Sequence, residues 1–129
     1  MKSTLAKLAM IALPLFGTVG TAHALSQNTV SNKFFDENGV LVGQQILLCN
    51  ALAYHAGNIH TAYTITESVA CSKNPPLDYI VPGTIITAYT LPGALSISSA
   101  CGQAECAPAG APEPLRITDK GWTWQNFWQ

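Results

Sequence analysis

Four cysteines constrain this chain more than any other feature, because their pairing decides which distant segments must lie together. They are Cys49, Cys71, Cys101 and Cys106, and four cysteines allow three pairings. We predict the pairs Cys49–Cys71 and Cys101–Cys106, since the first two bracket a segment typical of a strand return and the last two close a short loop that begins with Gly102. By chain entropy the larger loop adds about 3 kcal/mol of stability and the smaller about 2 kcal/mol.

The first 24 residues indicate the compartment in which these cysteines work. Lys2 and Lys7 form a positive start, residues 8–16 are an apolar run too short to span a bilayer, and Ala22-His23-Ala24 supplies the small residues that signal peptidase needs. We therefore expect a signal peptide at 1–24 and a single exported domain at 25–129, in the periplasm or the medium. An even set of cysteines normally forms disulfides there. Zinc, the other use of four cysteines, takes two close pairs, and this sequence offers one loose pair.

The charge of the exported part excludes several kinds of partner. It holds four basic and seven acidic residues, a net charge of about −3. Such a surface cannot supply the row of Lys and Arg that neutralises phosphates, so we expect neither nucleic acid nor anionic lipid as a partner. No later segment reaches the roughly 18 consecutive apolar residues of a spanning helix, so we expect no membrane insertion.

A β-hairpin is the clearest local signal in the chain. Residues 30–35 and 40–48 have the composition of strands and are joined by Asp36-Glu37-Asn38-Gly39. A type I turn with Gly39 in the left-handed conformation pairs Phe34 with Val42, whereas a tighter turn centred on Asn38-Gly39 pairs Phe34 with Gly43. The sequence leaves both registers open.

Further strands are predicted at 62–71 and 84–91, with a short one at 96–100. Residues 107–114, rich in Pro and Ala, are expected to form a linker or an exposed loop ahead of an aromatic C-terminal segment at 115–129. No stretch of ten or more residues in the exported part has a helical period. The predicted fold is all-β, a small disulfide-stapled antiparallel sandwich or barrel-like domain.

Three titratable residues are candidates for chemistry. His55 and His60 are separated by four residues, but Gly57-Asn58 between them is a turn signal, and the carboxylate of the zinc-protease pattern is missing. Glu67 interrupts the alternation of its strand and falls on the core face. A raised pKa would make it a functional acid, and a bulge or an edge position that returns it to water is the simpler explanation.

The C-terminal aromatics are the strongest candidate binding residues. Trp122, Trp124, Phe127 and Trp128 lie within the last eight residues of the chain. Indole rings stack on sugars or bury in a partner protein. The alternative, which we prefer for so small a core, is that the tail returns as a final strand and fills the domain's own interior.

The hairpin also carries a resemblance. Phe34-Phe35-Asp36, then Val42-Gly43 and then Cys49, is similar to an aromatic-aromatic-Asp, Val-Gly, Cys pattern of short exported bacterial proteins of uncharacterised function. The match covers residues 34–49. It implies a bacterial, exported, non-enzymatic protein and no catalytic residue.

These observations favour a non-catalytic exported binding or interaction module whose partner is a protein or a polysaccharide, with no cofactor and no metal. Two alternatives remain open. One is a small hydrolytic or metal-dependent enzyme that uses His55, His60 and Glu67. The other is an inhibitor of an extracellular enzyme that presents the loop between Cys101 and Cys106.

Overall fold

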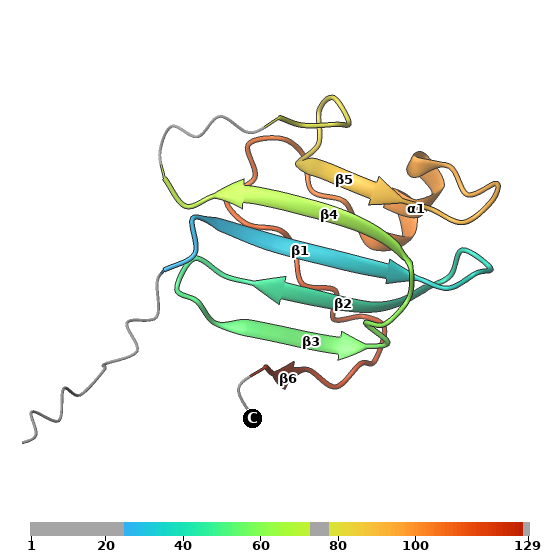
Figure 1. Cartoon of the computed structure of the whole chain (residues 1–129), viewed down its shortest axis with the longest axis horizontal. Helices are drawn as coiled ribbons and strands as arrows, with labels where there is room; N and C mark the ends of the chain where they lie inside the picture. Colours follow the sequence, from blue (N-terminus) through green and yellow to red (C-terminus); the bar gives the residue numbers. More distant parts are fainter. Residues whose placement is uncertain (1–24, 73–77, 128–129) are drawn as a thin grey trace, which may run out of the picture.

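The protein forms one antiparallel sheet of six strands in the order β5-β4-β1-β2-β3-β6 (Figure 1). The structure is a computed structural model that describes residues 25–72 and 78–127, so the predicted signal peptide and Trp128 lie outside the described residues. The prediction of an all-β, disulfide-stapled antiparallel domain is confirmed. The elements are β1 Asn28–Phe35, β2 Leu41–Leu47, β3 Ala53–Gly57, β4 Tyr63–Ala70, β5 Ile86–Thr90, α1 Ile97–Ala104 and β6 Gln125–Asn126.

The β1–β2 hairpin combines both predicted registers. The Asp36 carboxylate accepts hydrogen bonds from the backbone N–H groups of Asn38 and Val40. Gly39 has a positive φ of 77°, as the predicted type I turn with a left-handed glycine requires. Next to this turn Phe35 pairs with Leu41, as the first register requires. A bulge then shifts the ladder by one residue, and Phe34 pairs with Gly43, as in the second register.

Strands β1 to β4 form a Greek key. After the β1-β2-β3 meander the chain crosses from β3 to the far side of β1, so β4 lies beside β1 (Figure 1). Residues 58–62 must cover three strand spacings, about 14 Å, and five extended residues reach about 17 Å. The crossover therefore lies close on the sheet: the N–H of Asn58 donates to the Val42 carbonyl, and a Cβ on Gly43 would overlap the Asn58 carbonyl.

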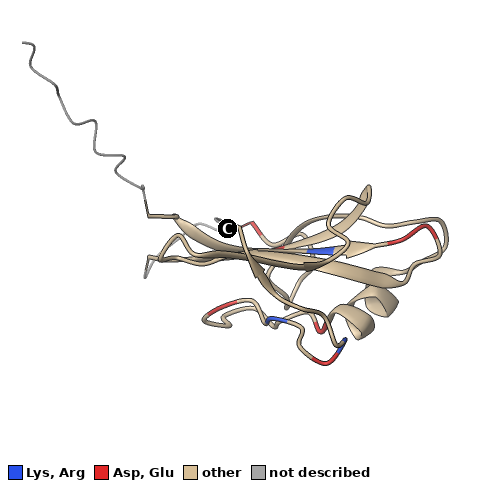
Figure 2. Ribbon diagram, turned by 90° about the horizontal axis from the view of Figure 1, so that it is seen from below, with Lys and Arg blue, Asp and Glu red and all other residues tan. Residues whose placement is uncertain are grey.

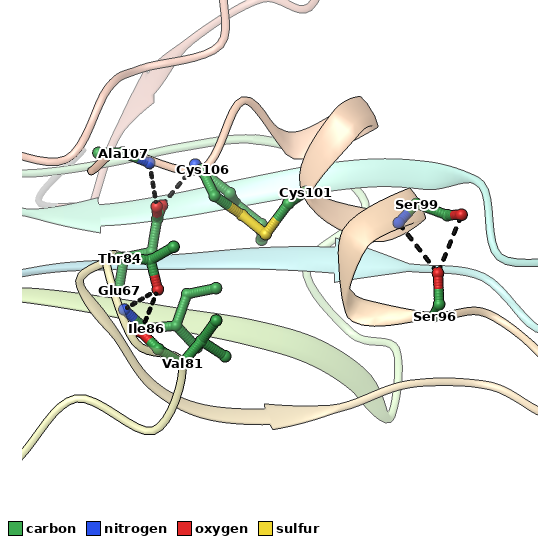
Figure 3. Close-up of a disulfide and its surroundings, with 10 residues drawn as sticks. Glu67, Val81, Thr84, Ile86, Ser96, Ser99, Cys101, Cys106 and Ala107 are labelled. Atoms are coloured by element: carbon green, nitrogen blue, oxygen red, sulfur yellow. Dashed lines mark hydrogen bonds and ion pairs between the residues drawn. A yellow bond between two sulfur atoms is a disulfide. The ribbon is translucent and has the colours of Figure 1, made fainter. Parts of the chain in front are cut away.

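A short helix stands where a strand was predicted. The expectation of a strand at 96–100 was wrong, because Ser96 caps α1 instead: its hydroxyl accepts a hydrogen bond from the Ser99 N–H at 3.1 Å (Figure 3). Eight residues are too few for a periodic pattern to be evident in the sequence. The helix buries Ala100 and Ala104 against the sheet.

The second layer of the domain is this helix and the extended chain after it, which cover one face of the sheet (Figure 2). The expected sandwich or barrel placed a second sheet or a closed wall there. The core between the layers is small. It consists of Phe35, Leu41, Ile65, Ile86, Ala100, Ala104 and Ile117.

Two side-chain amides, Gln44 fully buried and Gln103 half-buried, hold the irregular layer in place. Gln44 on β2 donates to the Leu115 carbonyl at 2.9 Å and accepts from the Ile117 N–H at 2.8 Å. Gln103 on α1 accepts from the Leu41 N–H and donates to the Gly39 carbonyl, which ties the helix to the hairpin. These contacts satisfy backbone groups that a second sheet would have paired.

Both predicted disulfides are confirmed. Cys49 and Cys71, with Cα atoms 5.7 Å apart, join the ends of β2 and β4. Cys101 and Cys106, with Cα atoms 4.9 Å apart, close the turn after the helix (Figure 3). The first bond links distant segments, whereas the second fixes how the chain leaves α1.

Candidate functional site

The C-terminal aromatic segment lies along the β3 edge of the sheet. Strand β6 pairs with β3, so that Gln125 lies opposite His55, and the Phe127 N–H donates to the Ala53 carbonyl at 3.1 Å. The preferred expectation was that the tail returns as a final strand and fills the core. Gln125 and Asn126 do form a strand, but both are exposed at the edge of the sheet. Trp122 is half-buried against the core, whereas Phe127 is 38% exposed.

Arg116 links this segment to the sheet. Its guanidinium lies 5.3 Å from the centre of the Tyr54 ring and 5.1 Å from that of the Trp124 ring. Both distances are within the range of cation–π attraction, worth about 0.5–1 kcal/mol at an exposed site. Trp124 itself is half-buried, and its indole N–H has no acceptor among the described residues. The Arg116 contacts hold two aromatic rings and one cation together at the sheet edge.

A cleft of about 560 Å³ opens beside Arg116. It is lined by the end of β2, by Tyr54 on β3 and by the chain from Pro112 to Arg116. This volume falls in the range of small-molecule and peptide-anchor sites. The lining residues are Ile46, Leu48, Tyr54, Pro112, Glu113, Pro114, Leu115 and Arg116.

Two exposed apolar side chains lie at the cleft and the adjoining β2–β3 turn. Leu115, which lines the cleft, is 55% exposed, and Leu52 is 46% exposed. The Leu48 N–H donates to the Leu52 carbonyl, which places Leu52 beside a residue that lines the cleft. Phe127 packs instead on His55, which the strand register places on the face of the sheet opposite to Tyr54. We call Leu52 and Leu115 the corner patch.

The three candidates for enzyme chemistry are not brought together. The strand registers place His55 in the same cross-strand row as Thr66, so Glu67, one residue further, faces the opposite side of the sheet. His55 Nε2 lies 3.1 Å from Gln125 Oε1, and its ring centre lies 4.7 Å from that of Phe127. His60 is exposed in the crossover. Among the described residues no group of three His, Cys, Asp or Glu side chains is placed to hold a metal ion.

The expectation that Glu67 returns to water was wrong. A bulge does interrupt the pairing of β4 with β5 at this point, but β4 is an inner strand and Glu67 is fully buried. Its carboxylate forms an ion pair with Lys33, which is also fully buried, and accepts a hydrogen bond from the Ala107 N–H at 2.7 Å (Figure 3). Burial lowers the pKa of Lys33, and the Glu67 charge opposes that effect. With both partners inaccessible, the pair is part of the interior.

Sequence reasoning missed Tyr54 and Arg116. Arg116 is one of only four basic residues after the predicted leader and precedes the tryptophans closely, and this was the available signal. Tyr54 belongs to β3, a strand that was not predicted because Gly57-Asn58 is a turn signal. The Pro/Ala-rich stretch is mostly exposed, as expected, but Ala107 and Pro114 near its ends are buried.

Comparison of the chain with protein-family models, curated proteins and solved structures gives no match. No described helix is long and apolar enough to cross a membrane.

Proposed function

We propose that the protein is an exported, non-catalytic interaction module that binds a partner protein through the cleft and the corner patch. The observation that carries this proposal is the joining of a 560 Å³ cleft with Arg116, held between Tyr54 and Trp124, on one edge of the sheet. Interfaces commonly combine aromatic residues, an arginine and an apolar anchor pocket in this way. The resemblance of residues 34–49 to short exported bacterial proteins supports the same reading.

A protein partner is favoured over a polysaccharide by the state of the aromatic rings. A polysaccharide platform needs open ring faces, but Arg116 lies over Tyr54 and Trp124, and Trp122 packs against the core. The exposed apolar side chains of the corner patch are instead the leucines Leu52 and Leu115, which match an apolar anchor from another protein. The separation of His55 and Glu67 to opposite faces supports a binding role over a hydrolytic one.

Site-specific photocrosslinking tests the proposal. A photoreactive phenylalanine analogue is placed at Leu115, and in a matched variant at Val40, which is similarly exposed on the hairpin. In the native exporting cells we expect a discrete crosslinked protein from position 115 and none from position 40, and we expect Arg116→Ala to weaken the product at position 115. Equal crosslinked products from positions 115 and 40 would overturn the proposal. So would binding of the protein to a glycan panel, if Arg116→Ala abolished that binding.

A further inference from the structure

Strand β5 forms the edge of the sheet opposite the cleft, and only its beginning is covered. Residues 107–109 pair with residues 83–85, and the Ile80 N–H donates to the Ile86 carbonyl. Beyond Ile86, no described segment pairs with the outer side of residues 87–90. The strand therefore presents unpaired backbone groups toward solvent, which is a template for another strand.

This edge is short and has a bulge at Thr87, but it lacks the charges and prolines that most often prevent association. Residues 79–104 contain no charged side chain, and β5 contains neither proline nor a charged residue. Ala88, Tyr89 and Thr90 are exposed. Ile80, hydrogen-bonded to β5, is 52% exposed, and its neighbour Tyr79 is 38% exposed. The unpaired backbone thus lies within an uncharged and partly apolar border.

The lack of charge favours a second copy of this chain as the occupant. In a two-fold contact each side chain meets its own equivalent or a close neighbour, so any charge on the strand would face a like charge. An uncharged edge avoids that repulsion, whereas a different partner would gain from a complementary charge. When β5 pairs antiparallel with the β5 of a second copy, the two-fold axis relates the strands, and no strand of a different sequence is needed.

We propose that two copies of the protein pair through β5 across a two-fold axis, forming one continuous twelve-stranded sheet. The cleft lies at the β3 edge, so the dimer carries its two clefts at opposite ends. The proposal does not depend on the function of the cleft. Because only residues 87–90 are free to pair, the contact is small, and we expect a dissociation constant on the order of 1–100 µM.

Sedimentation equilibrium of the exported, disulfide-intact chain from 1 to 500 µM measures this association. We expect the average mass to rise from one chain to two. Ala88→Lys adds a charge at an exposed position of the edge and should weaken dimerisation at least tenfold. Val40→Lys, the matched control, adds the same charge on the exposed hairpin and should leave the dimer unchanged. Thr90→Lys is the second edge variant, and circular dichroism confirms the fold of each.

Hydrogen exchange locates the contact. We expect the amides of residues 87–90 to exchange more slowly as concentration rises, with no such change in β3. A chain that remains monomeric at 500 µM would overturn the proposal, as would a dimer that both edge lysines leave intact. Concentration-dependent protection of β3 in place of β5 would do the same.

Discussion

The buried pair of Lys33 and Glu67 gives the sharpest stability prediction. Both side chains are fully buried, and their charges compensate each other in a core of few apolar residues. Lys33→Met leaves the Glu67 carboxylate without its cation, and breaking a buried pair in this way typically costs about 3–5 kcal/mol. Small domains have about 5–15 kcal/mol in total, so this variant should be close to unfolding.

The double variant Lys33→Met with Glu67→Gln separates the charge effect from packing. Glutamine keeps an acceptor for the Ala107 N–H, which Glu67 serves at 2.7 Å, while both charges are gone. We expect the double variant to lie within about 1 kcal/mol of the wild type, because an uncharged replacement of a buried pair is often neutral. The coupling between the two sites should therefore exceed about 2 kcal/mol.

Urea unfolding followed by tryptophan emission at pH 7, with both disulfides intact, measures these differences. A loss below about 1 kcal/mol for Lys33→Met would refute the reasoning, as would a double variant whose loss equals the sum of the two single losses.

The same pair has a predictable pH dependence. Burial lowers the pKa of Lys33 below its usual 10.5, so between the folded-state pKa and 10.5 the unfolded chain binds more protons than the folded one. The contribution of Lys33 to stability therefore rises with pH through that window. Relative to the uncharged double variant, the wild type should gain stability as the pH increases toward 10.5, and a relative loss would contradict the assignment.

Two further predictions concern the crossover and the tail. Gly43→Ala forces a methyl group against the Asn58 carbonyl and should lower the free energy of unfolding by more than about 2 kcal/mol, whereas Gly102→Ala, with open space at the Cβ position inside α1, should raise it by about 0.5–1 kcal/mol. Urea unfolding compares the two, and equal effects would show that the crossover does not press on the sheet. Trp124→Ala should cost about 1–3 kcal/mol, less than a fully buried indole, because Trp124 is only half-buried. Its removal should leave the emission blue-shifted through Trp122, and a wholly red spectrum would place Trp122 outside the core.

The features predictable from sequence are those that depend on local chemistry. The turn at Asp36 and Gly39 follows from a side-chain acceptor and a glycine. Strand β4 follows from the alternation of apolar and polar residues, and β1, β2 and β5 follow from their composition. The disulfide Cys49–Cys71 follows from two cysteines that bracket a segment typical of a strand return. The helix was missed because its eight residues are too few for a helical period to be evident in the sequence. Strand β3 was missed because Gly57-Asn58 indicated a turn, and this turn begins the crossover directly at the end of the strand.

The site was predictable only in part, because it depends on contacts between distant segments. The aromatic segment was recognised from its composition. The contact between Trp124 and Arg116 was not, because it depends on how the chain after the helix returns to β3. Glu67 was placed correctly on the core face. Its burial required a cation on β1, and no local pattern relates Lys33 to a residue 34 positions later.

Gln44 connects the interior of the domain to the proposed binding edge. Its amide holds the Leu115 carbonyl and the Ile117 N–H, the groups on either side of Arg116, and also donates to the Ser31 hydroxyl at 2.7 Å. Gln44 is fully buried, so Gln44→Met keeps most of the volume while leaving these groups without partners, at about 1–3 kcal/mol for a single orphaned group.

Because the irregular layer has no sheet of its own at this point, we expect Gln44→Met to release the chain around Arg116 as well as to destabilise the fold. Under conditions where the variant remains folded, crosslinking from position 115 should fall severalfold, while dimerisation through the opposite edge should be unchanged. Hydrogen exchange should show faster exchange at Ile117 than in the wild type. A variant that loses stability but retains full crosslinking would show that Arg116 is positioned by Tyr54 and Trp124 alone.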